Sequence, residues 1–462
     1  MKLGIRMFIA TVVCFTASVA LAGETQQITP GEVPAGISAV DWGIVQEVYL
    51  KASNTDAGDN FGASLESYWY FNKNAVAISG NTLVVGACKE DGSATGVNGN
   101  QSDNTATDAG AVYVFIKDGS GWSQQAYLKA FNAEAGDLFG QAVAIDGNTI
   151  VVGAPKEDSD AMGVNGNQSN NSSANSGAAY VFTRTGATWS QQAYLKSSDI
   201  TSAGNKFGLS VAVSGDTIVV GEPKGGSNWY EGASYVFVRS GGAWSPQATL
   251  SASSPDIEGA FGYSVAIAGD TLVIGEPWSY MSYEGGEVYV YVRGGTTWIQ
   301  QARLHHDAAY SLLHSFGCAL AISDNTVVVG AVREGTSGES YSGKGYVFVR
   351  DGTTWSRQAK LEASNTERDD WFGSSVAISG NIIAVGAVNE DGAATGTNGD
   401  QADNSASDSG AAYLFIRGGS TWSQQAYVKA PNTAAGDNFG AGVAIAGGTL
   451  VIGASGEDSG AI

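Results

Sequence analysis

The feature that most constrains this chain is a unit of four short strands, repeated along almost its whole length. The unit is clearest over residues 139–196, which begin Phe-Gly, run through VAIDGNTIVVGAP, cross a polar loop to SGAAYVFTR and end WSQQAYLK. Residues 143–145, 150–152 and 179–182 are β-branched or aromatic runs, which suit a pleated sheet. A DGN turn at 146–148 predicts a hairpin, and no window has a sustained helical period. The unit is therefore predicted to be an antiparallel four-stranded sheet.

Copies of this unit can be counted from its opening phenylalanine and from a tryptophan between its third and fourth strands. The copies begin 54 residues apart at the closest (Phe207 to Phe261) and 78 at the widest (Phe61 to Phe139). A four-stranded period of this size is typical of a propeller blade. We predict an all-β fold, a seven-bladed β-propeller of four-stranded antiparallel blades, with these aromatic residues packed between blades. The residues are Phe61, Phe139, Phe207, Phe261, Phe316, Phe372, Phe439, Trp122, Trp189, Trp244, Trp298, Trp355 and Trp422.

The repeated Phe-Gly start and Gly-Ala-Pro end resemble the FG-GAP repeats of the integrin α-subunit head and of its bacterial relatives. The resemblance covers residues 42–462. It implies a seven-bladed propeller used for extracellular binding and cell adhesion. Many members of that family carry a DxDxDG calcium loop in the first hairpin of a blade. Here that hairpin is only a tight turn, as at 146–148, so the calcium sites of the family are not carried over.

Both ends of the chain are predicted to contribute strands to the last blade. Residues 42–51 resemble a fourth strand with no blade before it. The copy that starts at Phe439 has two strands and stops at Ile462, where its third strand would begin. We predict that strand 42–51 closes the ring with an incomplete last blade. We also expect the chain to be a fragment of a longer protein, because an open blade would expose an edge.

The N-terminal 22 residues have the composition of a secretory signal peptide. Lys2 and Arg6 precede an apolar run over 7–19, and Ala20-Leu21-Ala22 is a small-residue exit. Residues 23–41 are predicted to be a linker, and no later segment is apolar enough to span a membrane. We expect a secreted, periplasmic or cell-surface protein. Cys88 and Cys318 fall at different positions of different copies, which predicts buried thiols and no disulfide.

The net charge of the chain limits the classes of partner that we expect it to bind. The formal net charge is −22, and removing the signal with Lys2 and Arg6 and no acids leaves −24. A negative field of this size disfavours nucleic acid and anionic membranes. It favours divalent cations or basic partners.

Long acidic loops follow the second strand in copies one, two and six, at 89–110, 156–177 and 389–410. Carboxylate oxygens at this density are the ligands that Ca²⁺ prefers. The alternative is a solvated loop whose acids close Asx turns on their own backbone. The candidate calcium ligands are Asp91, Asp103, Asp108, Asp158, Asp391, Asp403 and Asp408.

Aromatic residues gather in the corresponding short loops of copies three and four and in an insertion of copy one. Aromatic rings beside amides and carboxylates suit sugar stacking or a protein partner. The alternative is that they cover the apolar ends of blades. The candidate ligand-binding residues are Tyr68, Trp69, Tyr70, Trp229, Tyr230, Trp278, Tyr280 and Tyr283. His305, His306 and His314 lie in one loop, but their spacing matches no common metal motif.

The function predicted from these features is a non-catalytic extracellular scaffold. It would recognise a protein or glycan through the loops that join strands two to three and strand four to the next blade, with Ca²⁺ as a candidate cofactor. Two alternatives remain open at this point: a structural spacer of a larger exported protein, and a polysaccharide-active enzyme. We predict no enzyme, because no paired catalytic carboxylates or nucleophile motif stand out, although acids are abundant enough for two to meet in the central channel.

Overall fold

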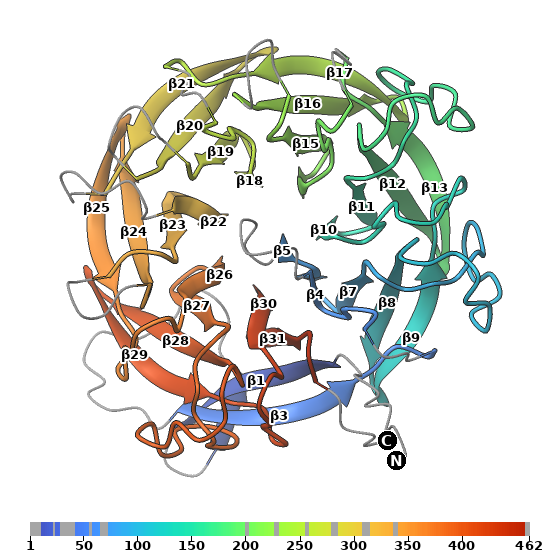
Figure 1. Cartoon of the computed structure of the whole chain (residues 1–462). Helices are drawn as coiled ribbons and strands as arrows, with labels where there is room; N and C mark the ends of the chain where they lie inside the picture. The colour runs from blue at the N-terminus through green and yellow to red at the C-terminus, as the bar shows by residue number, and fades with distance from the viewer. Residues whose placement is uncertain are drawn as a thin grey trace.

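The computed structural model describes residues 11–21, 24–27, 42–54, 58–64, 73–198, 203–225, 231–254, 258–278, 285–306, 315–335 and 341–457. Within them, six sheets of four consecutive antiparallel strands stand like blades around one axis (Figure 1). Blades one to three contain β6 (Val76–Ser79), β7 (Thr82–Ala87), β8 (Ala111–Asp118), β9 (Gly121–Leu128), β10 (Ala142–Asp146), β11 (Thr149–Ala154), β12 (Ala178–Thr185), β13 (Thr188–Leu195), β14 (Ser210–Ser214), β15 (Thr217–Glu222), β16 (Ala233–Ser240) and β17 (Ala243–Leu250). Blades four to six contain β18 (Ser264–Ala268), β19 (Thr271–Glu276), β20 (Glu287–Gly294), β21 (Thr297–Leu304), β22 (Phe316–Ser323), β23 (Thr326–Ala331), β24 (Lys344–Asp351), β25 (Thr354–Leu361), β26 (Phe372–Ser379), β27 (Ile382–Ala387), β28 (Ala411–Gly418) and β29 (Thr421–Val428).

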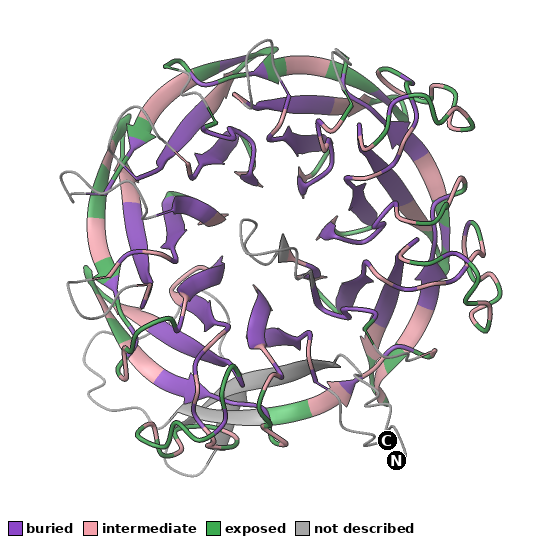
Figure 2. Ribbon diagram, viewed as in Figure 1, coloured by how far each residue is buried: buried purple, intermediate pink, exposed green. Residues whose placement is uncertain are grey.

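In most blades the second strand is the most completely buried, and burial falls from there towards the outer edge (Figure 2). In blade two, all six residues of β11 are buried, whereas β13 on the outer edge has exposed and half-buried residues over its first half. The second strand is covered on both faces by neighbouring blades, so it is a continuous apolar run and does not alternate. The predicted hairpin at 146–148 is present, with Asp146 opposite Thr149 and Gly147 at a φ of 56°.

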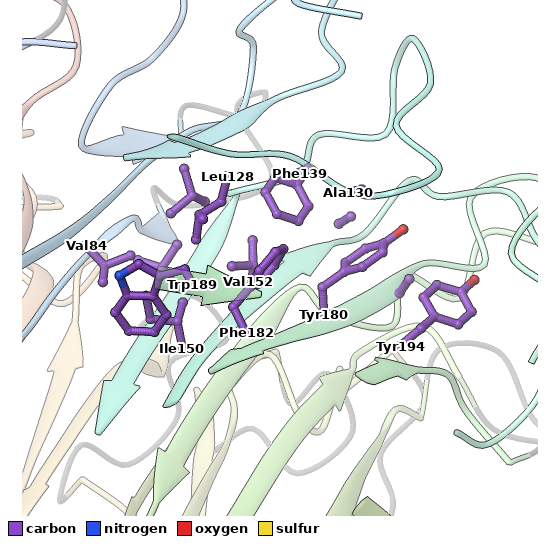
Figure 3. Packing of buried hydrophobic residues seen from close by; sticks show 14 of the residues in the cluster. Val84, Leu128, Ala130, Phe139, Ile150, Val152, Tyr180, Phe182, Trp189 and Tyr194 are labelled. Atoms are coloured by element: carbon purple, nitrogen blue, oxygen red, sulfur yellow. The ribbon is translucent and has the colours of Figure 1, made fainter. Parts of the chain in front are cut away.

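The core lies between blades, as the repeated aromatic residues predicted. Phe139 at the start of blade two packs edge-on against Tyr180 and Phe182, with ring centroids 5.3 Å and 6.1 Å away (Figure 3). Val84 of blade one belongs to the same cluster as Val152 of blade two. Each cluster therefore joins one blade to the next, and the ring is stabilised by burial of apolar surface at every junction.

The hairpin tryptophans also join blades through polar contacts. Trp189 donates its indole N–H to Gln125 of the preceding blade at 2.8 Å, and Arg184 lies over the Trp189 ring at 5.0 Å. Arg184 also donates to Thr82 of that blade at 3.1 Å. Four further junctions repeat the tryptophan–glutamine bond, through Trp244–Gln192, Trp298–Gln247, Trp355–Gln301 and Trp422–Gln358.

The seventh position of the ring differs from the prediction. We predicted seven four-stranded blades with the last one incomplete, but six blades are built from four consecutive strands. The seventh copy supplies only β30 (Phe439–Ala446) and β31 (Thr449–Ala454), which join a five-stranded sheet with strands from the other end of the chain. These are β1 (Thr11–Leu21), β2 (Glu24–Gln27) and β3 (Trp42–Leu50). β1 lies between β31 and β3 and pairs with both.

The innermost strands surround a channel along the axis. β6, β10, β14, β18, β22, β26 and β30 contact one another in a closed circle. The cavity that they enclose has a volume of about 290 Å³ and is lined mainly by valine, alanine and isoleucine. In the described part of the chain, its lining holds no aspartate, glutamate, histidine, lysine or arginine. Two small strands, β4 (Ala63–Ser64) and β5 (Lys73–Asn74), form a hairpin beside the first inner strand.

Candidate binding face

One end of the ring carries the connections from second to third strands and from fourth strands to the next blade. We call this end the loop face. In the described part of blades one to six, the opposite end carries the short hairpins between first and second and between third and fourth strands. The long loops of blades one, two and six, at 89–110, 156–177 and 389–410, all belong to the loop face.

Each long loop is fastened to the outer strand of its own blade. In blade one, Asn98 donates its backbone N–H to the Tyr127 carbonyl at 2.7 Å, and its side-chain oxygen accepts the Tyr127 N–H at 2.9 Å. Asn98 has a φ of 55°, a conformation that asparagine tolerates better than most residues. Asn165 with Tyr194, and Asn398 with Tyr427, repeat both bonds. The three loops therefore share one backbone arrangement.

A buried ion pair lies beneath each of these loops. Lys129 on the outer strand of blade one contacts Glu90 at 2.8 Å, and the two side chains are 0% and 1% exposed. The Tyr127 hydroxyl and the Asn54 side-chain amide both donate to Glu90 at 2.9 Å. Lys196–Glu157 at 2.9 Å and Lys429–Glu390 at 2.7 Å are the same pair in blades two and six.

This network was missed by the sequence reasoning, because lysine and glutamate are ordinarily surface residues. A signal was present. In the copies that carry long loops, a glutamate follows the second strand and a lysine ends the fourth strand. In blades three to five the residues at the lysine position are Ser251, His305 and Glu362. Burial lowers the pKa of Lys129, and Glu90 opposes that shift. The carboxylate thus holds the lysine charged inside the blade.

Five of the seven predicted calcium ligands accept hydrogen bonds from N–H groups of their own loops. Asp91 accepts the Asp108 N–H at 2.8 Å, and Asp158 and Asp391 accept the equivalent N–H groups of Asn175 and Asp408 at 2.7 Å and 2.8 Å. Asp103 accepts the Thr105 N–H and hydroxyl at 3.1 Å and 2.7 Å and bonds with Ser93; Asp403 accepts the Ser405 N–H at 3.1 Å. Hydrogen bonds from Ser93 and Thr105 lower the pKa of Asp103.

The bonds of Asp103 and Asp403 to the N–H two residues later are the Asx turns of the alternative. Asp91, Asp158 and Asp391 instead accept an N–H 17 residues away in the same loop. Among the described residues, no three or more Asp, Glu, His or Cys side chains come together as a metal site. Ca²⁺ binding stays a prediction from composition.

Two acids on the loop face have unusual titration. Asp137, in the loop that leads into blade two, accepts the Glu134 N–H at 3.0 Å and is 5% exposed. Burial raises its pKa to about 8, and the neighbouring Glu157 and Glu134 add to the shift. Asp370 occupies the same place before blade six, and burial raises its pKa to about 7. The charge of each of these two buried carboxyls on the loop face therefore changes with pH near neutrality.

Only one of the predicted ligand-binding aromatics lies in the described residues. Trp278 is half-buried and packs edge-on against Tyr263, with ring centroids 4.7 Å apart. Both belong to an apolar cluster with Leu209, Cys318 and Val332. This contact fits the alternative that Trp278 covers a blade end. Tyr68, Trp69, Tyr70, Trp229, Tyr230, Tyr280 and Tyr283 lie outside the described residues.

The histidine and cysteine predictions can also be placed. His306 is buried, with its ring 5.7 Å from Phe316, whereas His305 is exposed, so the two do not form a pair. His314 lies outside the described residues. Cys88 and Cys318 are both buried, and neither forms a disulfide within the described residues, as predicted.

A further feature that the sequence did not indicate is strain at the blade starts. The residue before each Phe-Gly has a positive φ, between 54° and 61°, and none of the seven is glycine. Such a conformation is costly for bulky residues such as Leu138 and Trp371. Trp371 packs on Ala63, Val388 and Ala441. The seven residues are Asn60, Leu138, Lys206, Ala260, Ser315, Trp371 and Asn438.

Comparison with known proteins gives one family. A protein-family model described as FG-GAP repeat matches the chain six times, at residues 122–182, 189–237, 244–291, 298–348, 355–415 and 422–462. Each match starts at a hairpin tryptophan, so the family unit runs from the fourth strand of one blade towards the third strand of the next. No curated protein matches the chain.

Proposed function

Because the chain belongs to the FG-GAP repeat family, we propose that it is a non-catalytic extracellular scaffold that binds a protein or a glycan through the loop face. The observation that carries this proposal is the shared, fastened arrangement of the three long loops over their buried lysine–glutamate pairs. A surface that is already ordered loses less conformational entropy when it binds. The exposed side chains of these loops are mostly amides, hydroxyls and carboxylates, which suit hydrogen bonding to a polar partner.

The central channel supports a role without catalysis. General acid–base chemistry needs titratable side chains that face the reacting group. The cavity on the axis is instead lined by apolar side chains such as Val143, Val211 and Val376. The described lining of this cavity thus offers no acid–base pair of the kind that a polysaccharide-active enzyme uses.

The proposed location outside the cell rests on the N-terminal export signal and on the family. Among the described residues, the structure contains no helix that is long and apolar enough to cross a membrane. The net charge of −22 suits a basic partner or a polar, uncharged glycan.

The proposal is tested by binding screens with matched variants. The protein is applied to a glycan array and to immobilised extracellular-matrix proteins. Hits are repeated with Asn104→Ala, Asn171→Ala and Asn404→Ala combined, which change the exposed tips of the three loops. The control is Thr188→Ala on the hairpin end of blade two. We expect the triple variant to lose binding and the control to keep it. Hits that the control abolishes and the triple variant keeps would contradict the loop face as the binding surface.

A further inference from the structure

Each buried lysine–glutamate pair also includes an asparagine amide. In blade one, Lys129 donates to Oε2 of Glu90 at 2.8 Å, and Asn54 donates from its side-chain Nδ2 to Oε1 of the same carboxylate at 2.9 Å. A single carboxylate therefore joins an amine to an amide. Blades two and six repeat this arrangement with Asn132–Glu157–Lys196 and Asn365–Glu390–Lys429.

A tyrosine of the third strand binds the oxygen of the same amide. Tyr113 is fully buried and donates its hydroxyl to Oδ1 of Asn54. A donor at this oxygen polarises the carbonyl and stabilises negative charge that develops on it. The oxygen of the Asn54 amide thus has a donor that supports attack at its carbon, and its nitrogen contacts a group, Glu90, that can deliver a proton.

The lysine of blade one has fewer acceptors than its counterparts. Lys429 of blade six donates to the Ser409 hydroxyl at 2.6 Å in addition to its glutamate, and blade two has the equivalent lysine–serine bond at 2.7 Å. Blade one has Ala109 in the place of that serine. Within the described part of the chain, Glu90 is the one acceptor of the Lys129 ammonium. Lys129 can therefore move towards the amide without losing a second hydrogen bond.

The ion pair of blade one contains the reactants of a condensation. In the ion pair the proton is on Lys129, and its transfer along the 2.8 Å hydrogen bond to Glu90 gives a neutral amine and a neutral acid, both out of water. Burial, which lowers the pKa of Lys129, favours this transfer. A desolvated neutral lysine is a nucleophile towards carbonyl carbons. The amide carbon of Asn54 is bound to the same carboxylate through Nδ2, so the nucleophile and its target are held together.

We propose that Lys129 and Asn54 form an isopeptide bond, which ties the outer strand of blade one to the loop that leads into that blade. Neutral Nζ attacks Cγ of Asn54, and Tyr113 stabilises the oxyanion on Oδ1. The new Cγ–Nζ bond stays, the Cγ–Nδ2 bond breaks, and Nδ2 leaves as NH₃.

Glu90 carries the protons of this reaction. Of the three protons on the lysine ammonium, one remains on the new amide nitrogen, one passes through Glu90 to Nδ2 and leaves with NH₃, and one remains on Glu90. The ion pair becomes an uncharged amide beside an uncharged acid, and no oxidant or other reactant is needed. Protein that has not reacted keeps the ion pair.

The test is the mass of the purified protein measured after denaturation, because an isopeptide bond survives unfolding. We expect a mass lower by one NH₃ than the amino-acid sequence requires, and a peptide map in which the fragments that contain Asn54 and Lys129 are joined. Lys129→Arg keeps a cation beside Glu90 but removes the primary amine, so it should have the full mass. Asn54→Ala, which removes the amide, gives the same expectation if the arginine variant does not fold.

A matched variant tests why blade one reacts. Ala109→Ser gives Lys129 the second acceptor that Lys429 has in blade six, so the NH₃ loss during refolding should be slower by about threefold or more. The full sequence mass in the unaltered protein would overturn the proposal. So would a loss of NH₃ that Lys129→Arg retains, since that loss would come from cyclisation at an Asn-Gly bond such as Asn98-Gly99. The mass is independent of what the loop face binds, which separates this result from the proposed function.

Discussion

The Lys129–Glu90 pair is the residue-scale feature on which the loop face most depends. Both charges are out of water, so the pair is held by mutual attraction and by donors from Tyr127 and Asn54. A buried pair adds little stability compared with apolar residues, but removing one partner leaves an unpaired buried charge. Its role is to fix the loop above it.

We expect Lys129→Met to lower the free energy of unfolding by about 3–5 kcal/mol, because Glu90 stays buried without its cation. Glu90→Gln combined with Lys129→Met should recover a large part of the loss. The matched control is Lys360→Met, whose lysine pairs with Glu334 at 3.1 Å but is 40% exposed, and this should cost about 1 kcal/mol or less. Urea unfolding measures all three. Equal losses for Lys129→Met and Lys360→Met would show that the buried pair is not formed in solution.

The second residue-scale prediction concerns pH. Burial raises the pKa of Asp137 from 3.8 in the unfolded chain to about 8 in the folded protein, so the folded state binds an extra proton between these pH values. Stability from this group is therefore present at low pH and is lost as the pH rises from about 4 to 8. We expect Asp137→Asn to raise Tm at pH 8 more than at pH 5, because the amide keeps an acceptor for the Glu134 N–H without a charge. Thermal scans at both pH values, with exposed Asp351→Asn as control, measure this; equal shifts at both would contradict the raised pKa.

At the scale of elements, the strands and hairpins were largely predictable. The β-branched runs, the DGN turn and the recurring Phe and Trp located the blades, because each signal repeats and is local in sequence. The roles of the loop acids were not predictable in the same way. The residues around Asp91 indicate oxygen ligands. The N–H group that the Asp91 carboxylate accepts belongs to Asp108, 17 residues later, and the local sequence does not show that the loop brings the two together.

The loops lead to a prediction about metal. If the carboxylates of Asp91, Asp158 and Asp391 are fully used in closing turns, the loops need no cation. We expect the Tm in excess EDTA and in millimolar CaCl₂ to agree within the error of the scan. MgCl₂ at the same ionic strength controls for general charge screening of the −22 net charge. A rise specific to Ca²⁺ would show that the loops bind it as their composition predicts, since a metal that binds the folded state must raise Tm.

At the scale of the whole molecule, the junction between β3 and blade one departs from the other junctions. Glu47 of β3 stands where the other blades have the glutamine that accepts from tryptophan, and it pairs with Lys117, which lies 5.9 Å from the Trp122 ring. A charge pair thus replaces the tryptophan–glutamine bond at the junction between β3 and blade one. The sequence could predict a closing strand from its resemblance to a fourth strand, but not that β1 would lie between it and β31. Residues 11–21 have the composition of an export signal and carry Val13 where the six third strands have tyrosine, although Phe15 matches their second aromatic position.

We expect charge reversal to reveal this junction in solution. Glu47→Lys and Lys117→Glu should each lower stability by about 1 kcal/mol, because both side chains are about one-quarter exposed and each change places like charges together. The double reversal should restore most of the loss, and the coupling is read from a double-mutant cycle in urea. Losses that simply add would mean that β3 does not lie beside blade one.

The central claim is that the three long loops form an ordered surface before any partner binds. Hydrogen exchange of the free protein, followed by mass spectrometry over residues 89–110, 156–177 and 389–410, tests it most directly. The amides of Asn98, Asn165 and Asn398 donate to outer-strand carbonyls, so we predict exchange slowed by about 100-fold or more relative to the unfolded chain. Lys129→Met should lose that protection in blade one and leave it in blade six. Exchange at the unfolded rate in all three loops of the unaltered protein would contradict the account.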